Sequence, residues 1–415
     1  MKKLVRPSVI NGTIPAPASK SMMQRAIAIA TLAKGTSVLN NYTPCNDSDA
    51  ALVIAADLGS TVSIIGNVVT ITGRTGTAKQ DLSCGEAGLG IRMFTPIATL
   101  WDSQIILHGE GSLKKRPIDM LEGPLSELGV SIKTNGGFVP ITVHGPLKGG
   151  IAHVDGSISS QMLTGLLVAL PLAEQDTKLI VKDLKSKPYI DMTLEILADF
   201  GVEVSHDNYE TFTIKGNQLY KPTNYNVEGD WSGASFLLVA GALGGRVEVT
   251  NLRINSKQAD LQIIKAIEQA GAIIIEGNGS VIVEKNKLEA FEFDASECPD
   301  LFPPLVSLAC HCTGITKIKG VSRLKHKESD RATVLKTEFG KIGTEITLDG
   351  DYMFVKGGTV KGGSLHANND HRIAMAGAVA GILSQNPIEI ENTECIAKSY
   401  PGFFEDFIKI GGVSL

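Results

Sequence analysis

The sequence is poor in features that mark several large classes of protein. Only 5% of its 415 residues are aromatic and its formal net charge is −5, which argues against a nucleic-acid-binding surface. No apolar run reaches the roughly 18 residues that a membrane span needs. The basic start at Met1–Lys3 has no apolar signal segment after it. With 43% apolar and 20% charged residues, the composition is that of a folded globular protein.

The six cysteines are too scattered to predict a zinc site or a disulfide framework. Cys310, His311 and Cys312 resemble half of a metal site, but no second pair completes four ligands, and these residues fall late in an apolar helix. We therefore expect buried thiols, no metal, no cofactor and a reducing compartment, the cytoplasm. The sequence also has no GxxxxGK[ST] phosphate loop and no GxSxG elbow, and Gly85–Gly90 only loosely resembles a dinucleotide loop.

Instead, the sequence carries a unit of roughly 70 residues that recurs six times, which indicates an array of supersecondary units. Each unit opens with a long apolar helix. The predicted first helices are Ser19–Lys34, Gly85–Trp101, Ser159–Glu174, Asp230–Gly245, Glu297–Gly314 and Asn368–Ser384. A short strand, a second amphipathic helix and a hairpin follow. The second helices are predicted to begin at Asp47, Asp119, Asp191, Asp260, Asp330 and, in the sixth unit, near Pro401.

The two ends of the sequence complement each other. The sixth repeat lacks its closing hairpin, whereas an apolar stretch, Leu4–Ile14, precedes the first repeat. We predict that residues 1–18 supply the strands that the last repeat lacks. The repeats then divide into two lobes of three, residues 1–18 plus 230–415 and residues 19–229, with a hinge near residues 15–19 and 227–230.

The predicted fold class is α/β (α+β). Each lobe contains three βαβαββ repeats with buried helices, an inside-out α/β barrel, because helices that are apolar nearly all round belong inside a domain. A cleft between two lobes is a common place for a small ligand, so we expect the functional site there.

Basic residues stand where helix physics disfavours them. Cations at a helix N-terminus oppose the macrodipole, yet the first helices begin with Lys20, Arg25, Arg92 and Arg372. The starts of the second helices repeat the pattern at Lys114–Pro117, Ser186–Tyr189, Lys325–Arg331 and Lys398. Helix N-termini combined with cations favour a ligand with several phosphate or carboxylate groups. The alternative is that these side chains simply reach solvent.

Two acids, Asp300 and Glu328, lie among the basic residues. Nearby cations favour their ionised forms, and closure of a cleft would desolvate them and open a route to proton transfer. Helix capping or salt bridging is the alternative, and the sequence alone does not separate the two.

Seven short motifs, in order along essentially the whole chain, resemble the 5-enolpyruvylshikimate-3-phosphate synthase family. They are Pro17–Ser21 followed by Arg25, Lys115–Pro117, Gly156–Gln161, Ser186–Asp191, Lys327–Arg331, Asn369–Arg372 and Ala397–Ser399. The resemblance implies the family fold, two lobes of three βαβαββ units with the helices inside, and a monomer. It also implies transfer of the enolpyruvyl group from phosphoenolpyruvate to the 5-hydroxyl of shikimate 3-phosphate, with release of phosphate through a tetrahedral intermediate.

The same resemblance implies roles for individual residues. Shikimate 3-phosphate would be bound by Lys20, Ser21, Arg25, Ser159, Ser160, Gln161, Ser186, Tyr189, Asp300 and Lys327. Phosphoenolpyruvate would be bound by Lys20, Gly88, Arg116, Gln161, Arg331, Arg372 and Lys398. Asp300 would accept the 5-hydroxyl proton and Glu328 would protonate the vinyl carbon, while Lys20 supports charge and proton movements around the leaving phosphate.

Three positions depart from the family pattern: Glu86 and Leu89 stand where many members have Asn and Thr, and Ser112 where some have Arg. We expect a cation such as Arg92 to pair with Glu86, since an unpaired acid would work against an anion site. Two alternative functions remain open. A UDP-N-acetylglucosamine enolpyruvyl transferase would carry a cysteine loop near residues 112–116, which is missing here, and a non-catalytic phosphometabolite-binding protein would not need Asp300 and Glu328.

Overall fold

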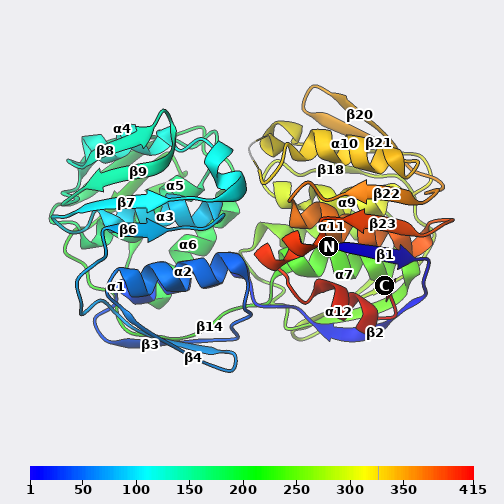
Figure 1. Ribbon diagram of the computed structural model, residues 1–415, viewed down its shortest axis with the longest axis horizontal. Helices are drawn as coiled ribbons and strands as arrows, with labels where there is room; N and C mark the ends of the chain where they lie inside the picture. The colour runs from blue at the N-terminus through cyan, green and yellow to red at the C-terminus, as the bar shows by residue number, and fades with distance from the viewer. Residues whose placement is uncertain (326) are drawn as a thin grey trace. The chain divides into compact units, whose positions relative to one another are not determined.

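The computed structural model describes residues 1–325 and 327–415, and His326 lies outside the described residues. The chain forms two compact units (Figure 1). Unit 1 contains Met1–Pro17 and Glu228–Leu415, and unit 2 contains Ala18–Val227. The chain therefore passes between the units twice, and bending at these two connections stays a prediction.

Unit 2 holds the first three repeats, each with a four-stranded sheet. The first repeat contains α1 (Lys20–Leu32), α2 (Asn46–Asp57), β3 (Thr36–Asn40), β4 (Thr61–Ile65), β5 (Val68–Thr72) and β14 (Asn224–Asn226). The second contains α3 (Gly88–Ala98), α4 (Glu122–Glu127), β6 (Asp81–Ser83), β7 (Gln104–His108), β8 (Ser131–Asn135) and β9 (Phe138–His144). The third contains α5 (Gln161–Ala169), α6 (Lys187–Asp199), β10 (Gly150–Asp155), β11 (Thr177–Lys182), β12 (Val204–Asp207) and β13 (Thr211–Ile214).

Unit 1 repeats this plan with the remaining three sheets. The fourth repeat contains α7 (Trp231–Gly244), α8 (Ile263–Gln269), β2 (Ile10–Pro15), β15 (Gly245–Thr250), β16 (Ile273–Glu276) and β17 (Ser280–Glu284). The fifth contains α9 (Phe302–Ala309), α10 (Arg331–Lys341), β18 (Glu292–Asp294), β19 (Ile315–Lys319), β20 (Glu345–Asp349) and β21 (Tyr352–Lys356). The sixth contains α11 (His371–Ala380), α12 (Phe403–Lys409), β1 (Lys2–Arg6), β22 (Gly363–His366), β23 (Ile388–Glu391) and β24 (Val413–Ser414).

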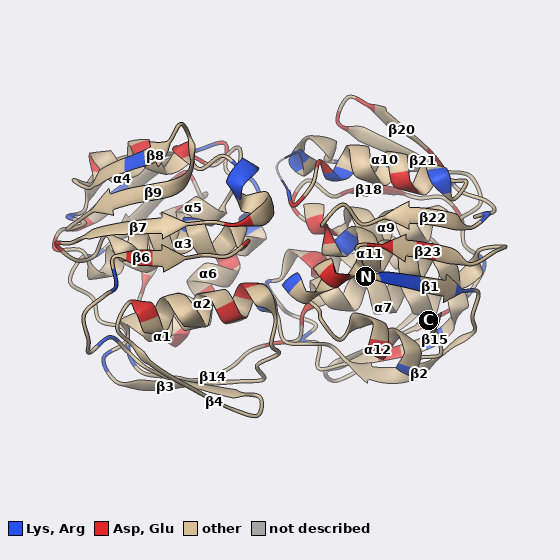
Figure 2. Ribbon diagram, in the orientation of Figure 1, with Lys and Arg blue, Asp and Glu red and all other residues tan. Residues whose placement is uncertain are grey.

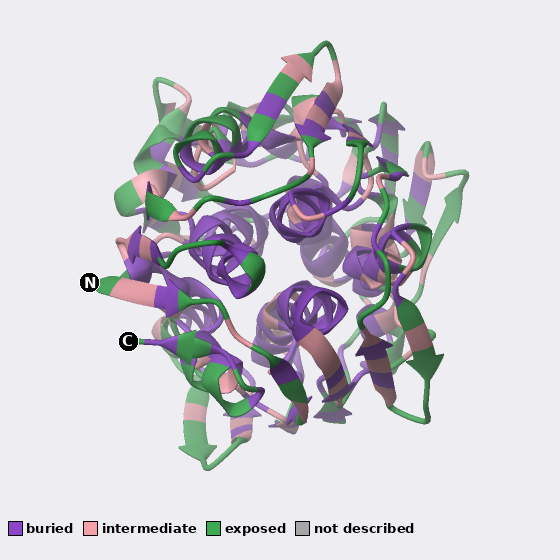
Figure 3. Ribbon diagram, turned by 90° about the vertical axis from the view of Figure 1, so that its right-hand side faces the viewer, coloured by how far each residue is buried: buried purple, intermediate pink, exposed green. Residues whose placement is uncertain are grey.

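The first helix of each repeat is an interior helix, as the sequence predicts. Every residue of α7 is buried, and no charged residue occurs in α7 or α9, so these helices are uncharged along their length in Figure 2. The strands instead alternate, as in β11, where buried and exposed residues follow one another. Each sheet thus covers helices with one face and meets solvent with the other, and the buried helices lie inside the unit that faces the viewer in Figure 3.

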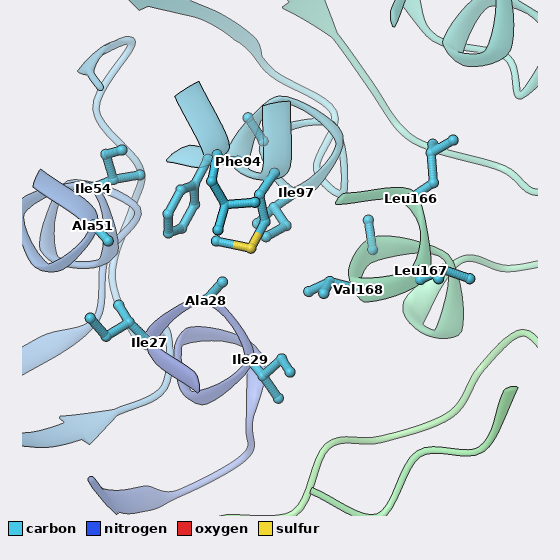
Figure 4. Packing of buried hydrophobic residues seen from close by; sticks show 14 of the residues in the cluster. Ile27, Ala28, Ile29, Ala51, Ile54, Phe94, Ile97, Leu166, Leu167 and Val168 are labelled. Atoms are coloured by element: carbon cyan, nitrogen blue, oxygen red, sulfur yellow. The ribbon is translucent and has the colours of Figure 1, made fainter. Parts of the chain in front are cut away.

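The core of unit 2 forms where α1, α3 and α5 pack together. Figure 4 shows side chains of these helices and of α2 meeting, among them Ala28, Phe94 and Val168. Close packing of α3 on α5 depends on Gly165, because a Cβ at this position would lie 2.6 Å from the carbonyl oxygen of Arg92. The interior helices therefore fix the positions of their own N-terminal ends, where the polar residues lie.

Two details of the sequence prediction are wrong. Helix α6 begins at Lys187 rather than at Asp191, since Ser186 is the N-cap and Pro188 suits the first helical turn. Residues 1–18 do not all complete the last repeat. Strand β1 pairs with β23 and β24 in the sixth sheet, but β2 pairs in parallel with β15 of the fourth. The last repeat instead gains its fourth strand from residues 413–414.

Replacing Gly165 by alanine should destabilise unit 2 by about 1–3 kcal/mol, because the added methyl group forces α3 and α5 apart. Gly340 in α10 is the matched control: nothing lies within 4 Å of a Cβ placed there, so Gly340→Ala should be neutral or stabilising by up to about 1 kcal/mol. Urea unfolding followed by circular dichroism measures both variants. Equal stability of Gly165→Ala and the wild type would contradict the close helix contact.

Candidate active site

The charged residues singled out in unit 1 converge at the starts of its helices. Asp300 lies in the short 3-10 helix η5 (Pro299–Leu301), directly before α9. Glu328 precedes α10, Arg331 is the first residue of α10, and Arg372 lies in the first turn of α11. Because the apolar sequences of α9 and α11 place both helices in the interior, their polar N-terminal ends come together.

Asp300 is the centre of this cluster. Its Oδ1 accepts a hydrogen bond from Arg331 Nη1 at 2.9 Å and pairs with Lys327 Nζ at 3.1 Å, while Oδ2 accepts from Arg372 Nη2 at 3.2 Å. Burial by itself raises the pKa of Asp300, but Arg372, Lys327 and Arg331 outweigh burial and hold this pKa well below its ordinary value. Asp300 is therefore ionised at neutral pH, and a ligand that draws these cations away would make it a stronger base.

Arg331 has no exposed side-chain surface and is surrounded by carboxylates. Its Nε donates to Asp370 Oδ2 at 2.9 Å and its Nη2 to Glu328 Oε2 at 2.6 Å, in addition to the bond to Asp300. Burial opposes the charge, yet Asp370, Glu328 and Asp300 raise the pKa of Arg331 above its ordinary value. The carboxylates explain why a cation is stable at this helix start.

Two lysines complete the predicted set in unit 1. Burial lowers the pKa of the Lys327 amine, and the negative charge of Asp300 offsets this effect only in part. Lys398 is buried at the end of the 3-10 helix η8 (Thr393–Lys398), which packs against α11. Both lysines thus belong to segments that adjoin the helix starts.

A second buried carboxylate, Asp260, lies in the 3-10 helix η4 (Ala259–Gln262). Its Oδ2 accepts a hydrogen bond from the Ser232 hydroxyl, and its Oδ1 has no hydrogen-bond partner among the described residues. Burial, and then the negative charge of Asp300, raise the pKa of Asp260 to about 7. The environment therefore separates the two acids: Asp300 is ionised, whereas Asp260 holds its proton up to neutral pH.

In unit 2, Arg25 is almost completely buried on α1. Its Nε donates to Thr193 Oγ1 at 2.9 Å, Nη1 to the Ser21 carbonyl at 2.8 Å and Nη2 to the Tyr189 carbonyl at 3.3 Å. Burial lowers the pKa of Arg25 to about 10, and no carboxylate pairs with it among the described residues. A buried cation with neutral partners strongly favours an anionic ligand.

The neighbouring helix starts present hydroxyl groups. Ser160 is the buried N-cap of α5, and the Ser159 hydroxyl accepts a hydrogen bond from the Gln161 backbone amide at 3.2 Å. Ser186, the N-cap of α6, has φ of +58°, a strained conformation for serine that is common at functional sites. Lys20, at the start of α1, pairs with Asp47 of α2 at 2.8 Å. These residues extend the polar surface around Arg25.

Arg92 connects three other parts of the predicted site. Its Nη1 donates to the Gly88 carbonyl at 3.0 Å and to Gln161 Oε1 at 3.2 Å, and its Nη2 donates to the Pro117 carbonyl at 2.7 Å. Arg116 packs so closely on Gly88 that a Cβ there would lie 2.3 Å from its Nη1. Arg92 therefore brings the loop that ends at Pro117 to the start of α3.

The structure shows Ser112 as a hydrogen-bond partner of Glu86, and pairing of Glu86 with a cation such as Arg92 stays a prediction. Glu86 Oε2 accepts a hydrogen bond from the Ser112 backbone amide at 3.0 Å and another from its hydroxyl at 2.8 Å. Two positions that depart from the family pattern thus contact each other. This contact cannot be predicted from the sequence, because Glu86 and Ser112 lie 26 residues apart in separate segments.

Sequence reasoning also missed the roles of Asp370 and Asp260, since each fits a plain helix-start position. Asp370 does cap α11 by accepting a hydrogen bond from the Arg372 backbone amide at 3.1 Å, and it also holds Arg331. The folded chain reveals that Asp370 lies between two arginine-bearing helix starts, and the sequence does not show this. Asp260 gives no comparable signal.

The Cys310–Cys312 segment lies in the interior of unit 1. His311 Nε2 is 2.8 Å from the Ala380 carbonyl, burial lowers the pKa of His311 to about 4, and both cysteines are buried and free. Within residues 1–325 and 327–415, no group of three or more His, Cys, Asp or Glu is placed to hold a metal ion. In the same residues, every helix is too short or too polar to cross a membrane.

Comparison with known proteins gives consistent matches. Residues 5–407 match the model of the family described as EPSP synthase (3-phosphoshikimate 1-carboxyvinyltransferase). A 3-phosphoshikimate 1-carboxyvinyltransferase of Clostridium novyi is 38% identical over 420 residues, covering 98% of this chain and 97% of the relative. One from Clostridium perfringens is 38% identical over 422 residues, with 100% and 99% coverage.

Solved structures agree with these sequence matches. An EPSP synthase structure from Acinetobacter baumannii superposes with a TM-score of 0.85 at 26% identity, covering 100% of this chain and 99% of the other. The enolpyruvyl transferase NikO of Streptomyces tendae shares the fold with a TM-score of 0.80, at 17% identity and with 100% and 98% coverage.

The raised pKa of Asp260 makes a prediction about stability. The folded protein binds this proton more tightly than the unfolded chain, so the associated stability is full below about pH 4 and is lost as pH rises toward 7. Asp260→Asn is uncharged throughout. Its unfolding free energy relative to wild type should therefore increase by on the order of 2–4 kcal/mol from pH 4 to pH 8 in urea titrations.

Asp294→Asn is the control, because the pKa of Asp294 is shifted in the opposite direction from that of Asp260. Hydrogen bonds from Ser296 and the ion pair with Lys319 overcome partial burial and lower the pKa of Asp294. The stability of this variant relative to wild type should therefore fall as pH rises to about 4 and stay constant from pH 4 to pH 8. A stability difference for Asp260→Asn that does not change with pH would contradict a buried, protonated Asp260.

Proposed function

The chain belongs to the EPSP synthase family, and from this premise we propose which of its residues carry out the reaction. It is a 3-phosphoshikimate 1-carboxyvinyltransferase, which transfers the enolpyruvyl group of phosphoenolpyruvate to the 5-hydroxyl of shikimate 3-phosphate and releases phosphate. This is a step of the shikimate pathway to aromatic amino acids. Both substrates carry a phosphate and a carboxylate, which suits helix starts that are rich in cations.

We assign shikimate 3-phosphate first to the helix starts around Arg25. The phosphate would supply the negative charge that buried Arg25 lacks, and the Ser21, Ser159, Ser160 and Ser186 hydroxyls would donate to its oxygens. The other proposed contacts are made by Lys20, Gln161, Tyr189, Asp300 and Lys327.

We assign phosphoenolpyruvate to the remaining cations. The proposed contacts are made by Lys20, Gly88, Arg116, Gln161, Arg331, Arg372 and Lys398. Arg331 and Arg372 both donate hydrogen bonds to the Asp300 carboxylate. An anionic substrate that engages these two arginines would weaken their hold on Asp300 and so raise its affinity for a proton.

The observation that carries the mechanism is that Asp300 and Glu328 share Arg331. In the proposed addition, Asp300 takes the proton of the 5-hydroxyl, and the alkoxide oxygen forms a bond to C2 of phosphoenolpyruvate as the C2–C3 double bond opens. Glu328, which takes up a proton when substrate draws Arg331 away from it, gives that proton to C3. In the elimination, the Glu328 carboxylate takes a proton from C3, the C2–C3 double bond re-forms, the C2–O bond to phosphate breaks, and the proton held by Asp300 leaves with the phosphate. Lys20 and Lys398 would stabilise the negative charge on the departing phosphate, and no cofactor takes part.

Phosphate release tests this function against its alternatives. Purified protein should release phosphate from phosphoenolpyruvate when shikimate 3-phosphate is present, and should not do so with UDP-N-acetylglucosamine, because residues 111–117 contain no cysteine. Release with UDP-N-acetylglucosamine alone would favour the related enolpyruvyl transferase. Tight binding of shikimate 3-phosphate without any release would favour a non-catalytic binding protein.

Asp300→Asn should lower kcat by roughly 10²–10⁴-fold, because an amide of the same size cannot accept the 5-hydroxyl proton. The KM for phosphoenolpyruvate should stay the same or fall, since the variant no longer competes for Arg331 and Arg372. Asp294→Asn, which removes an ion-paired carboxylate elsewhere in unit 1, should retain the wild-type kcat. A near-normal kcat for Asp300→Asn would rule out Asp300 as the base.

We also propose that the protein acts as a monomer in the cytoplasm. Six buried free cysteines suit a reducing compartment. Light scattering coupled to gel filtration should give the 44.0 kDa mass of one chain, and cell fractionation should place the protein with cytoplasmic markers. A dimer mass or a membrane-bound fraction would contradict the respective proposal.

A further inference from the structure

Two loops of unit 2 are joined by a continuous set of contacts beyond the ends of β6 and β7. These parallel strands pair up to Ser83 and His108. Past that point, the Cys84 amide donates to the His108 carbonyl at 2.9 Å, and the Glu110 amide donates to the Gly85 carbonyl at 2.7 Å. The pairing of the strands thus continues into the loops as backbone hydrogen bonds.

The next contact is the side chain of Glu86 on Ser112. One carboxylate oxygen of Glu86 accepts two hydrogen bonds, from the backbone amide of Ser112 at 3.0 Å and from its hydroxyl at 2.8 Å. Hydrogen bonds to an ionised acceptor are stronger than neutral ones. Ser112 is the second residue of the short 3-10 helix η1 (Gly111–Lys115), so Glu86 fixes the start of the segment that carries Lys114, Lys115 and then Arg116.

Two glycines make the remaining close contacts possible. A Cβ at Gly111, whose φ is +48°, would lie 2.3 Å from the Glu86 carboxylate carbon. A Cβ at Gly88 would lie 2.3 Å from Arg116 Nη1. The carboxylate of Glu86 therefore packs on the backbone of one loop, and the guanidinium of Arg116 packs on the backbone of the other.

The far end of the segment is also held from α3, because Arg92 donates to the Pro117 carbonyl at 2.7 Å. Without anchors at both ends, a short segment with three successive cations, Lys114, Lys115 and Arg116, would be pushed apart by its own charge. Glu86 and Arg92 thus clamp the segment on either side of Arg116.

We propose that Glu86 and Ser112 are positioning residues for phosphoenolpyruvate: their hydrogen bonds keep residues 111–116 in place, so that Arg116 stays on Gly88 where the substrate binds. This inference rests on the proposed function, in which Arg116 and Gly88 contact phosphoenolpyruvate. If Glu86 simply repelled the anionic substrate, its loss would strengthen substrate binding. The positioning role predicts the opposite, that loss of Glu86 weakens substrate binding.

Steady-state kinetics with both substrates varied provides the test. Glu86→Ala should raise the KM for phosphoenolpyruvate about tenfold, since both charge-assisted hydrogen bonds are lost. Its kcat and its KM for shikimate 3-phosphate should stay within about twofold. Ser112→Ala keeps the backbone bond and should raise the KM for phosphoenolpyruvate only about threefold. Glu86→Gln keeps an acceptor oxygen and should remain within about threefold of wild type.

The double variant Glu86→Ala with Ser112→Ala should match Glu86→Ala alone, because the two side chains act through one contact. Glu122 is the matched control: its carboxylate accepts hydrogen bonds from the backbone amide and hydroxyl of Thr134 in the same unit. Glu122→Ala should lower thermal stability but leave both KM values unchanged.

Several outcomes would overturn the proposal. A lower KM for phosphoenolpyruvate in Glu86→Ala would mean that Glu86 repels the substrate. Equal rises in both KM values would mean a general loss of structure. Multiplicative effects in the double variant would mean that Glu86 and Ser112 have independent roles. Arg116→Ala separates this inference from the proposed function. If Arg116→Ala raises the KM for phosphoenolpyruvate and Glu86→Ala does not, only the positioning role fails; if Arg116→Ala has no effect, the assignment of the substrate site fails.

Discussion

Burial of the Arg331 guanidinium constrains the whole polar end of unit 1. Transferring a charge from water into the protein costs several kcal/mol even after relaxation, so such a group is stable only with charged or strongly polar partners. Asp300, Glu328 and Asp370 provide those partners from three different helix starts. The pairing holds these starts together, ionises Asp300 and leaves the neighbouring Asp260 as the acid that keeps a proton.

The buried arginine of unit 2 has neutral hydrogen-bond partners instead of carboxylates. Among the described residues, the Arg25 guanidinium donates to hydroxyl and carbonyl oxygens of Thr193, Thr164, Ser21 and Tyr189 and to no carboxylate. An anion that reaches Arg25 gains a full charge interaction, whereas an anion that reaches Arg331 or Arg372 must compete with carboxylates already in place. This difference suits a division of labour in which one set of cations binds substrate and the other also regulates the proton affinity of the acids.

The sequence predicts those features that depend on local pattern. The interior helices follow from segments that are apolar all round, and the cations at their starts are visible because they oppose the helix dipole. The pairing of β2 with β15 was not predictable, since it joins residues 10–15 to residues 245–250. Asp191 alone predicts a start of α6 that is too late, because Ser186 and Pro188 mark the actual start. The Glu86–Ser112 contact and the proton on Asp260 depend on side chains from separate segments, which only the folded chain brings together.

Hydrogen bonds within each unit hold the chain on both sides of the two connections. At the first connection, the Ala16 amide donates to the Thr250 carbonyl within unit 1, and the Ala18 amide donates to Thr43 Oγ1 within unit 2. At the second, the Val227 carbonyl accepts from Asn41 in unit 2, and the Gly229 amide donates to the Asn251 carbonyl in unit 1. Each connection is therefore fixed to within about one residue of the crossing. The backbone on each side of the crossing is therefore hydrogen-bonded to its own unit, which holds the clusters around Arg331 and Arg25 each within one unit.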